Sequence, residues 1–216
     1  MANPQQYFIS DFHFNHGNII NFERTQFNTI QEHDDFLVKK ITEWALKLPK
    51  GSTLWNLGDF GSTDYLWTID ILRNAGIHCI FMYGNHDGAS NLEKFQKYFD
   101  EVYQYPTYIS NRIAISHIPV AVWPDTVNIH GHLHGSVLDS NNYITCSIND
   151  VNWEPVPEKY IQSKLGKLPK YTRRFMWEPF ADMMKFSENR EDIVMNKDGK
   201  IDLAASRALQ KLNQKK

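Results

Sequence analysis

The stretch Ile77-His78-Cys79-Ile80-Phe81-Met82-Tyr83-Gly84-Asn85-His86-Asp87 joins an almost uninterrupted apolar run to a short polar run. Residues 77–83 have the length of one β-strand, and a strand without polar alternation is typical of a parallel sheet covered on both faces. The polar run carries an amide, an imidazole and a carboxylate where that strand would end. Because α/β proteins form their ligand crevices at the carboxyl ends of strands, this stretch predicts a parallel sheet with a polar site at its edge.

Four further polar runs follow apolar stretches in the same way. They are Ser10-Asp11-Phe12-His13, Gly58-Asp59, Ser116-His117 and Gly131-His132-Leu133-His134. Together the five runs offer carboxylate oxygen, amide oxygen and imidazole nitrogen but no thiolate, a ligand set that suits Mn, Fe, Zn or Mg. Any one run occurs by chance in many chains, but the ordered set does not, so it predicts a metal site.

The spacing within two of these runs predicts how their side chains point. Asp11 and His13 are two residues apart, as are His132 and His134. In extended backbone this spacing places both side chains on one side, so Asp11 and His13 can share an ion. Gly131 is expected to let the backbone bend tightly against the cluster.

The remaining patterns predict an α/β half followed by a strand-rich half. Expected strands cover residues 6–10, 53–57, 77–83, 103–109, 112–116, 127–130 and 143–148, and expected helices cover 29–48, 63–74 and 90–99. The segment 12–28 lacks helical spacing and is expected to be a long loop. This order predicts two sheets packed face to face with helices outside, a four-layer α/β/β/α sandwich.

The composition fits one domain with an extension. The 216 residues, 42% of them hydrophobic, are enough for one core, which we place in residues 1–156, with residues 157–216 as a basic and aromatic C-terminal extension packed on or flanking it. No apolar run reaches the roughly 18 residues of a membrane span, and both cysteines, Cys79 and Cys146, lie inside apolar runs. We therefore expect a soluble, cytoplasmic protein without disulfides and without a membrane partner.

Charge is distributed unevenly along the chain. Residues 1–165 hold 18 acidic and 11 basic side chains, whereas residues 166–216 hold 7 acidic and 12 basic ones. The basic tail suits either a nucleic-acid backbone or a solvated surface. Its aromatic residues suit either stacking on bases or docking of the extension on the core. These residues are Tyr171, Phe175, Trp177 and Phe180.

The five runs resemble the motifs D-x-H, G-D, G-N-H-D/E, H and G-H-x-H of the calcineurin-like metallophosphoesterases. The resemblance covers about residues 7–156 and implies two divalent metal ions, Mn first, with Fe, Zn, Ni or Mg as alternatives. It implies that Asp11, His13 and His134 bind the first ion, that Asn85, His117 and His132 bind the second, and that Asp59 bridges both. It also implies that His86 faces the scissile phosphate without binding metal, and that Asp87 orients and charges His86.

The chain is also similar to a subgroup of small bacterial and phage phosphoesterases in which the first motif continues as H-F-x-H, N-I-I and an arginine. Here the corresponding residues include His16, Asn18 and Arg24. The resemblance suggests that Arg24 grips a phosphate oxygen, although a surface ion pair with Glu23 is an equally good interpretation. His16 and Asn18 are candidates for substrate contact.

The function implied by these observations is hydrolysis of a phosphodiester or phosphomonoester by in-line attack of a metal-bridging hydroxide. We expect a small or nucleotide-like substrate. One alternative is a nuclease whose basic tail follows DNA or RNA. A second alternative is a non-catalytic interaction module on the same fold, which usually goes with loss of ligands. The sequence predicts no particular oligomeric state.

Overall fold

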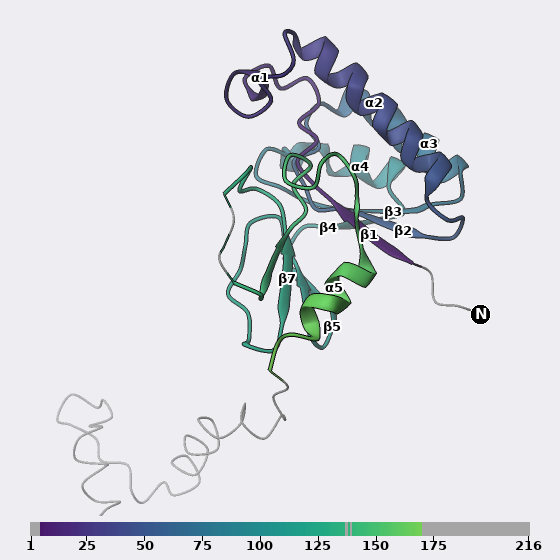
Figure 1. The fold of residues 1–216 in the computed structure, drawn as a ribbon. Coiled ribbons are helices and arrows are strands. Elements are labelled where there is room, and N and C mark those ends of the chain that lie inside the picture. Colours follow the sequence, from purple (N-terminus) through teal and green to yellow (C-terminus); the bar gives the residue numbers. More distant parts are fainter. Residues whose placement is uncertain (1–4, 137, 139, 170–216) are drawn as a thin grey trace, which may run out of the picture. The chain divides into compact units, whose positions relative to one another are not determined.

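Two β-sheets form the centre of the fold (Figure 1). The structure is a computed structural model and describes residues 5–169, except 137 and 139. In spatial order the first sheet contains β4 (Glu101–Tyr103), β3 (His78–Met82), β2 (Thr53–Asn56), β1 (Gln6–Ile9) and β9 (Val156–Pro157). Strands β1 to β4 are parallel and β9 is antiparallel, so the predicted parallel sheet is confirmed.

The second sheet is smaller. In spatial order it contains β5 (Thr107–Ser110), β6 (Ile113–Ile115), β7 (Val127–His130) and β8 (Tyr143–Thr145). Strands β6, β7 and β8 are parallel, and β5 pairs with β6 in the antiparallel sense. The strand-rich second half of the sequence therefore forms its own sheet, as predicted.

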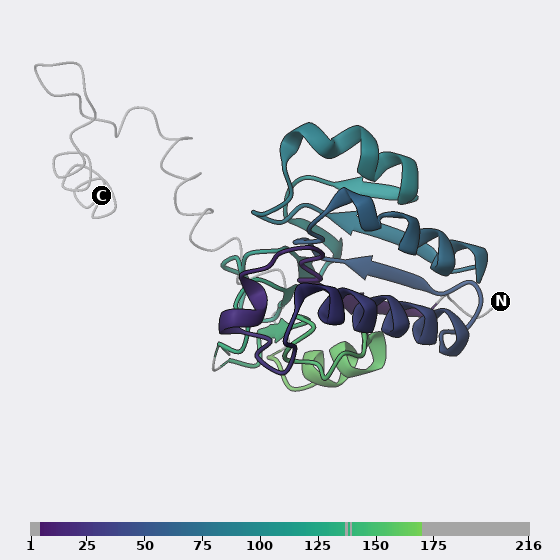
Figure 2. The ribbon, with the colours of Figure 1, turned by 90° about the horizontal axis from the view of Figure 1, so that it is seen from above.

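Three helices cover one face of the first sheet (Figure 2). They are α2 (Ile30–Lys47), α3 (Trp67–Asn74) and α4 (Leu92–Tyr98). The Thr29 hydroxyl caps α2 by accepting a hydrogen bond from the Glu32 amide, and α2 buries Leu37, Ile41 and Trp44 against the sheet. The three- and four-residue spacing of these apolar side chains is what identified the helix in the sequence.

Alternate residues of the first sheet serve two different cores. On β1, Ile9 packs in the core beneath the helices, whereas its neighbour Phe8 packs in the core between the sheets. Leu54 and Trp55 on β2 divide in the same way. Because successive side chains of a strand point to opposite faces, a strand that is apolar throughout must be covered on both sides. The α/β sandwich therefore follows directly from these continuous apolar runs.

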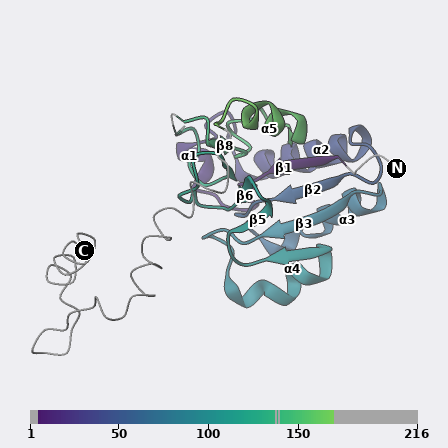
Figure 3. The same cartoon turned by 90° about the horizontal axis from the view of Figure 1, so that it is seen from below.

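The described chain ends with α5 (Glu158–Leu165), which lies against β1, β9 and β7. Ile161 and Leu165 are buried in the core between the sheets. Figure 3 shows α5 and α4 at opposite edges of the first sheet. The first residues of the predicted extension thus pack on the domain, while the aromatic residues at 171, 175, 177 and 180 lie outside the described residues.

Several boundaries differ from the sequence prediction. The single strand expected at residues 103–109 is wrong: Tyr103 ends β4 in one sheet and Thr107 begins β5 in the other. Pro106 lies between them, and proline supplies no amide for a continuous ladder. The expected helices 63–74 and 90–99 begin with the 3₁₀ turns η1 (Thr63–Tyr65) and η2 (Ala89–Asn91), and the expected loop 12–28 contains the short helix α1 (Ile19–Phe22).

Both cysteines are buried and free, as expected. Among the described helices, none combines the length and the apolar character that crossing a bilayer requires.

Candidate metal centre

Polar side chains from both sheets gather where five strands end. Asp11, Asp59 and Asn85 follow β1, β2 and β3 of the first sheet, and His117 and His132 follow β6 and β7 of the second. Parallel strands place their carboxyl ends along one edge, and the packing of the two sheets brings both edges together. The residues that the sequence places at the carboxyl edge therefore lie together there.

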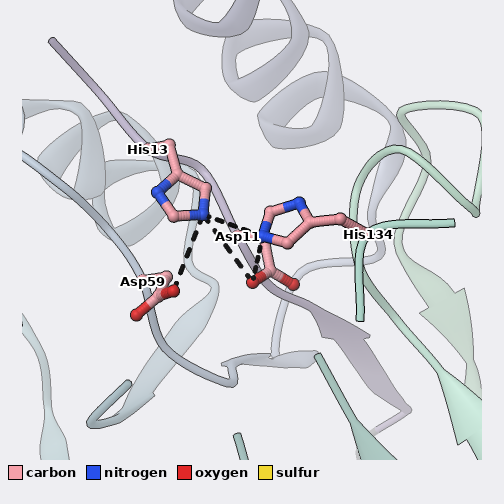
Figure 4. A group of neighbouring side chains, drawn as sticks. All are labelled: Asp11, His13, Asp59 and His134. Carbon is pink, nitrogen blue, oxygen red and sulfur yellow. Dashed lines mark hydrogen bonds and ion pairs between the residues drawn. The ribbon is translucent and has the colours of Figure 1, made fainter. Parts of the chain in front are cut away.

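The first group of possible ligands consists of Asp11, His13, Asp59 and His134 (Figure 4). One nitrogen or oxygen atom from each lies within 4.8 Å of the others. His13 Nε2 is 3.1 Å from His134 Nε2 and 3.6 Å from Asp59 Oδ2, and His134 Nε2 is 3.5 Å from Asp11 Oδ1. Two carboxylates and two imidazoles that converge in this way can bind a divalent cation.

The second group consists of Asp59, His117 and His132, again within 4.8 Å. His117 Nε2 lies 3.2 Å from Asp59 Oδ2 and 3.0 Å from Asn85 Oδ1, so the Asn85 amide joins this group. His117 Nδ1 donates to the Leu57 carbonyl at 2.8 Å, which directs Nε2 toward the group.

Asp59 is the residue that both groups share. Its Oδ1 accepts a hydrogen bond from the His86 amide, but Oδ2 is buried and accepts no well-aligned hydrogen bond from any described residue. Burial acts to raise the pKa of this carboxyl, but the neighbouring His117 and the His86 amide outweigh it and lower the pKa to about 2. A buried, ionised oxygen between two sets of imidazoles has the chemistry of a bridging metal ligand.

The His13 imidazole is in the form that binds metal. Burial, with Arg24 and the neighbouring imidazoles His134 and His16, lowers the pKa of His13 to about 2 against the opposite effect of Asp59. Neutral imidazole carries the lone pair that a metal ion requires. The close approach of His13 Nε2 and His134 Nε2 fits two lone pairs directed at one cation.

Five of the expected ligands have left-handed backbone conformations, with φ between 40° and 72°. They are Asp11, His13, Asp59, His132 and His134. This corrects the expectation that Asp11–His13 and His132–His134 are extended: the side chains converge because the backbone turns sharply after each strand. Non-glycine residues adopt this region at a cost, and such residues cluster at functional sites.

Two glycines let the backbone approach the carboxylates. A β-carbon on Gly84 would overlap the Asp59 carboxylate, and one on Gly131 would lie 2.5 Å from Asp11 Oδ2. The tight bend expected at Gly131 is therefore required by space. The His132 amide donates to Asp11 at 3.1 Å, and the Ser10 hydroxyl donates to it at 2.5 Å.

His86 is exposed at the edge of the site, with its ring 5.3 Å from the His13 ring between centroids. The structure corrects the expected role of Asp87. Its carboxylate is buried and accepts hydrogen bonds from the amides of Asp59, Phe60 and Gly84 at 2.8–3.0 Å. Because both oxygens are occupied by backbone amides, Asp87 joins the Gly58–Phe60 turn to the loop after β3 and does not orient the His86 ring.

A hollow of about 250 Å³ opens beside the first group, and both His86 and His16 line it. His16 Nδ1 lies 3.2 Å from His13 Nδ1, and its ring lies 5.2 Å from the His86 ring. Its substrate contact stays a prediction. Asn18 is exposed before α1, and its side chain makes no hydrogen bond within the described part of the chain.

Arg24 lies neither over the hollow nor on the surface, so both interpretations of this residue are wrong. Its side chain is fully buried, and its guanidinium donates to the carbonyls of Asp11 and Phe12, to Asn149 Oδ1 and to His33 Nε2. Sequence reasoning missed Asn149, because nothing local relates it to Arg24, 125 residues away. His33 is buried outside both groups.

Comparisons with known proteins agree with this geometry. The calcineurin-like phosphoesterase family matches residues 6–203. The chain is 29% identical over 170 residues to the uncharacterized protein MJ1445 of Methanocaldococcus jannaschii, covering 72% of this chain and 88% of that one. It is similar to the crystal structure of a protein of unknown function, AQ665 from Aquifex aeolicus, with 28% identity, a TM-score of 0.59, and coverage of 74% and 99%.

The family match extends over most of the chain, and the residues that carry the motifs converge in one buried Asp/His cluster. The chain therefore belongs to the calcineurin-like phosphoesterase family.

Proposed function

We propose that this protein hydrolyses phosphoesters with two divalent metal ions held side by side at the candidate metal centre. The position of Asp59 is the observation that carries the proposal. Its Oδ2 lies 3.6 Å from His13 Nε2 and 3.2 Å from His117 Nε2, and it accepts no well-aligned hydrogen bond from a described residue. A shared carboxylate is what holds two ions close enough to act on one phosphate.

The ligands divide as the two groups do. Asp11, His13 and His134 would hold the first ion, Asn85, His117 and His132 the second, and Asp59 both. Mn is our first candidate, with Fe, Zn, Ni and Mg as alternatives, since the donors are oxygen and nitrogen throughout. When bound, the ions would lower the pKa of a water molecule and neutralise charge on the phosphoryl oxygens, and the water would attack in line with the leaving group.

The side chains around the hollow have roles of their own in this proposal. His86 stands outside both ligand groups and lines the hollow, where it can donate a proton to the leaving oxygen. His16 lies beside it and beside His13. Asp87 keeps the loop that carries Asn85 and His86 joined to the turn that carries Asp59.

The substrate we propose is small or nucleotide-like. The hollow, at about 250 Å³, lies below the range of roughly 300–1,000 Å³ that drug-sized ligands occupy. It has room for a phosphate together with a small adjoining group beside His13 and His86.

Metal analysis and hydrolysis of model esters test the proposal together. The full chain, loaded with Mn²⁺ and desalted, should contain two ions and should hydrolyse bis-p-nitrophenyl phosphate or p-nitrophenyl phosphate. A panel of cyclic nucleotides and oligonucleotides would then identify the substrate class. A folded protein that binds no metal and hydrolyses none of these esters would refute the proposal and favour the interaction module.

The nuclease alternative is supported by the excess of basic side chains in residues 166–216. It predicts binding of oligonucleotides whose affinity falls steeply with salt, because each neutralised phosphate releases counterions. Hydrolysis of small esters with no salt-dependent oligonucleotide binding would favour the small substrate.

A further inference from the structure

We propose that Arg24 is a positioning residue that clamps the loop of Asp11 and His13 into the shape that binds the first metal ion. The inference rests on the proposed two-metal function. Arg24 acts on the ligands through their backbone and touches neither substrate nor metal.

The contacts of the guanidinium all lead to this loop or to its neighbours. Nη1 donates to the Phe12 carbonyl at 2.7 Å, and Nη2 donates to the Asp11 carbonyl. Nε donates to Asn149 Oδ1 at 2.8 Å, and Nη1 also reaches His33 Nε2. One rigid, planar group therefore holds two successive carbonyls between the first two metal ligands of the chain.

The loop needs such a clamp because its backbone is strained. Asp11, His13 and Asn15 have φ values of 62°, 54° and 55°. Side chains other than glycine disfavour this left-handed region, and a single strained residue persists only when its surroundings over-determine it. The Gly58–Phe60 turn accepts hydrogen bonds from the amides of this loop, and Arg24 holds the loop's carbonyls.

A second set of contacts continues the clamp. His33 Nδ1 lies 2.8 Å from Asp34 Oδ1, and Asp34 Oδ2 accepts the Asn15 amide at 3.0 Å. Because His33 Nδ1 donates to Asp34, its Nε2 is the acceptor that faces Arg24. The chain Arg24–His33–Asp34 thus holds the loop at Asp11 and Phe12 on one side and at Asn15 on the other.

The electrostatics of Arg24 also point to a specific role. The side chain is fully buried, yet the four acceptors around it are two carbonyls, an amide and an imidazole, none of them a carboxylate. Trp153 lies against it, with the guanidinium carbon 5.3 Å from the ring centroid. A buried cation without an opposite charge in contact is costly for the fold. A side chain that only filled this space would need no charge. A side chain that holds two carbonyls in place does need one.

The clamp acts on one metal group only. The Arg24 contacts reach the residues around Asp11 and His13, whereas Asn85 and His117 are positioned by the ends of β3 and β6. Loss of the clamp should therefore lower the affinity for the first ion by about 10- to 100-fold, the usual scale when a group that supports a metal ligand is removed. The second ion should keep its affinity.

The test uses the full chain stripped of metal and titrated with Mn²⁺, with calorimetry and electron paramagnetic resonance as readouts. The wild-type protein should bind two ions and show the spectrum of a coupled pair. The R24K variant should bind one ion normally and show an isolated Mn²⁺ signal at the same loading. In metal-free R24K, the amides of residues 13–15 should exchange hydrogen faster than in the wild type, because the loop that carries them is no longer held at the carbonyls of Asp11 and Phe12.

Arg112 supplies the matched control. It donates to the carbonyls of Asp125 and Leu165, away from the described metal groups. R112K should therefore leave both affinities and the coupled spectrum unchanged. If R24K does not fold, N149A removes a single acceptor of the clamp. It should also lower the affinity for the first ion, but by a smaller factor.

Two results have distinct meanings. Wild-type affinities and a coupled spectrum in folded R24K, or in N149A if R24K does not fold, would overturn the clamp and leave the two-metal proposal standing. A wild-type protein that binds no Mn²⁺ would overturn the two-metal proposal itself and the clamp with it.

Discussion

The two ligand groups differ in how firmly the protein holds them. In the first group Asp11 and His13 are buried, and their backbone is tied to the Gly58–Phe60 turn and to Arg24. In the second group His117 is buried and His132 is half-buried, as His134 is in the first group, but Asn85 is exposed. Ligands that are fixed before the ion arrives bind it more tightly, whereas exposed ligands leave room for substrate and exchange. The structure thus separates a pre-organised half from an open half.

Asp59 belongs to both ligand groups, so replacing it should disturb both. The D59N variant should lose both ions and at least about 10⁴-fold in turnover, as when a residue that acts as part of a catalytic unit is removed. Metal content and hydrolysis of bis-p-nitrophenyl phosphate measure this. D35N, which changes an exposed aspartate on α2, is the control and should match the wild type. Two bound ions with normal turnover in D59N would contradict the bridge.

Replacing His86 should separate metal binding from turnover. H86A should keep both ions and lose about 10²- to 10⁴-fold in kcat, the range for loss of a general acid. Measuring kcat and metal content on the same preparation tests this. H78A removes an exposed imidazole at the beginning of β3 and should change neither quantity. Loss of metal in H86A would show that this side chain is a ligand.

The pre-organised half should bind metal first. We expect H13A to weaken binding of the tighter of two Mn²⁺ ions and N85A to weaken only the weaker one, each by more than the roughly 10- to 100-fold that loss of a supporting group costs. Calorimetric titration of the two variants, compared with the wild type, separates the two constants. Loss of the tighter ion in N85A would reverse the assignment of the firm and open halves.

The smallest effect is expected at Gly131, which lies against the Asp11 carboxylate. G131A places a β-carbon 2.5 Å from Asp11 Oδ2 and should lower the free energy of unfolding by about 1–3 kcal/mol, as overpacking does. G17A is the matched control, since nothing lies within 4 Å of its β-carbon. Denaturant unfolding of both variants makes the comparison, and equal stability would show that the loop relaxes freely.

The sequence by itself predicted most of the elements and the candidate ligands. Continuous apolar runs at residues 53–57 and 77–83 predicted buried parallel strands, and the three- and four-residue spacing in 29–48 predicted α2. These signals are local, because periodicity records which faces of an element are buried. The position of the candidate ligands could be expected because each polar run follows a strand and because parallel strands end along one edge. The resemblance to the family motifs implied which of them would bind each ion.

Tertiary structure alone decided how the ligands are held. The left-handed turns at Asp11 and His13, the attachment of Asp87 to backbone amides and the burial of Arg24 depend on partners far along the chain. The break between β4 and β5 is similar, since residues 103–109 alternate plausibly for one strand and only packing assigns them to two sheets. Local pattern describes which residues are apolar or polar. It carries no information on contacts such as that between Arg24 and Asn149, which form only when distant segments pack together.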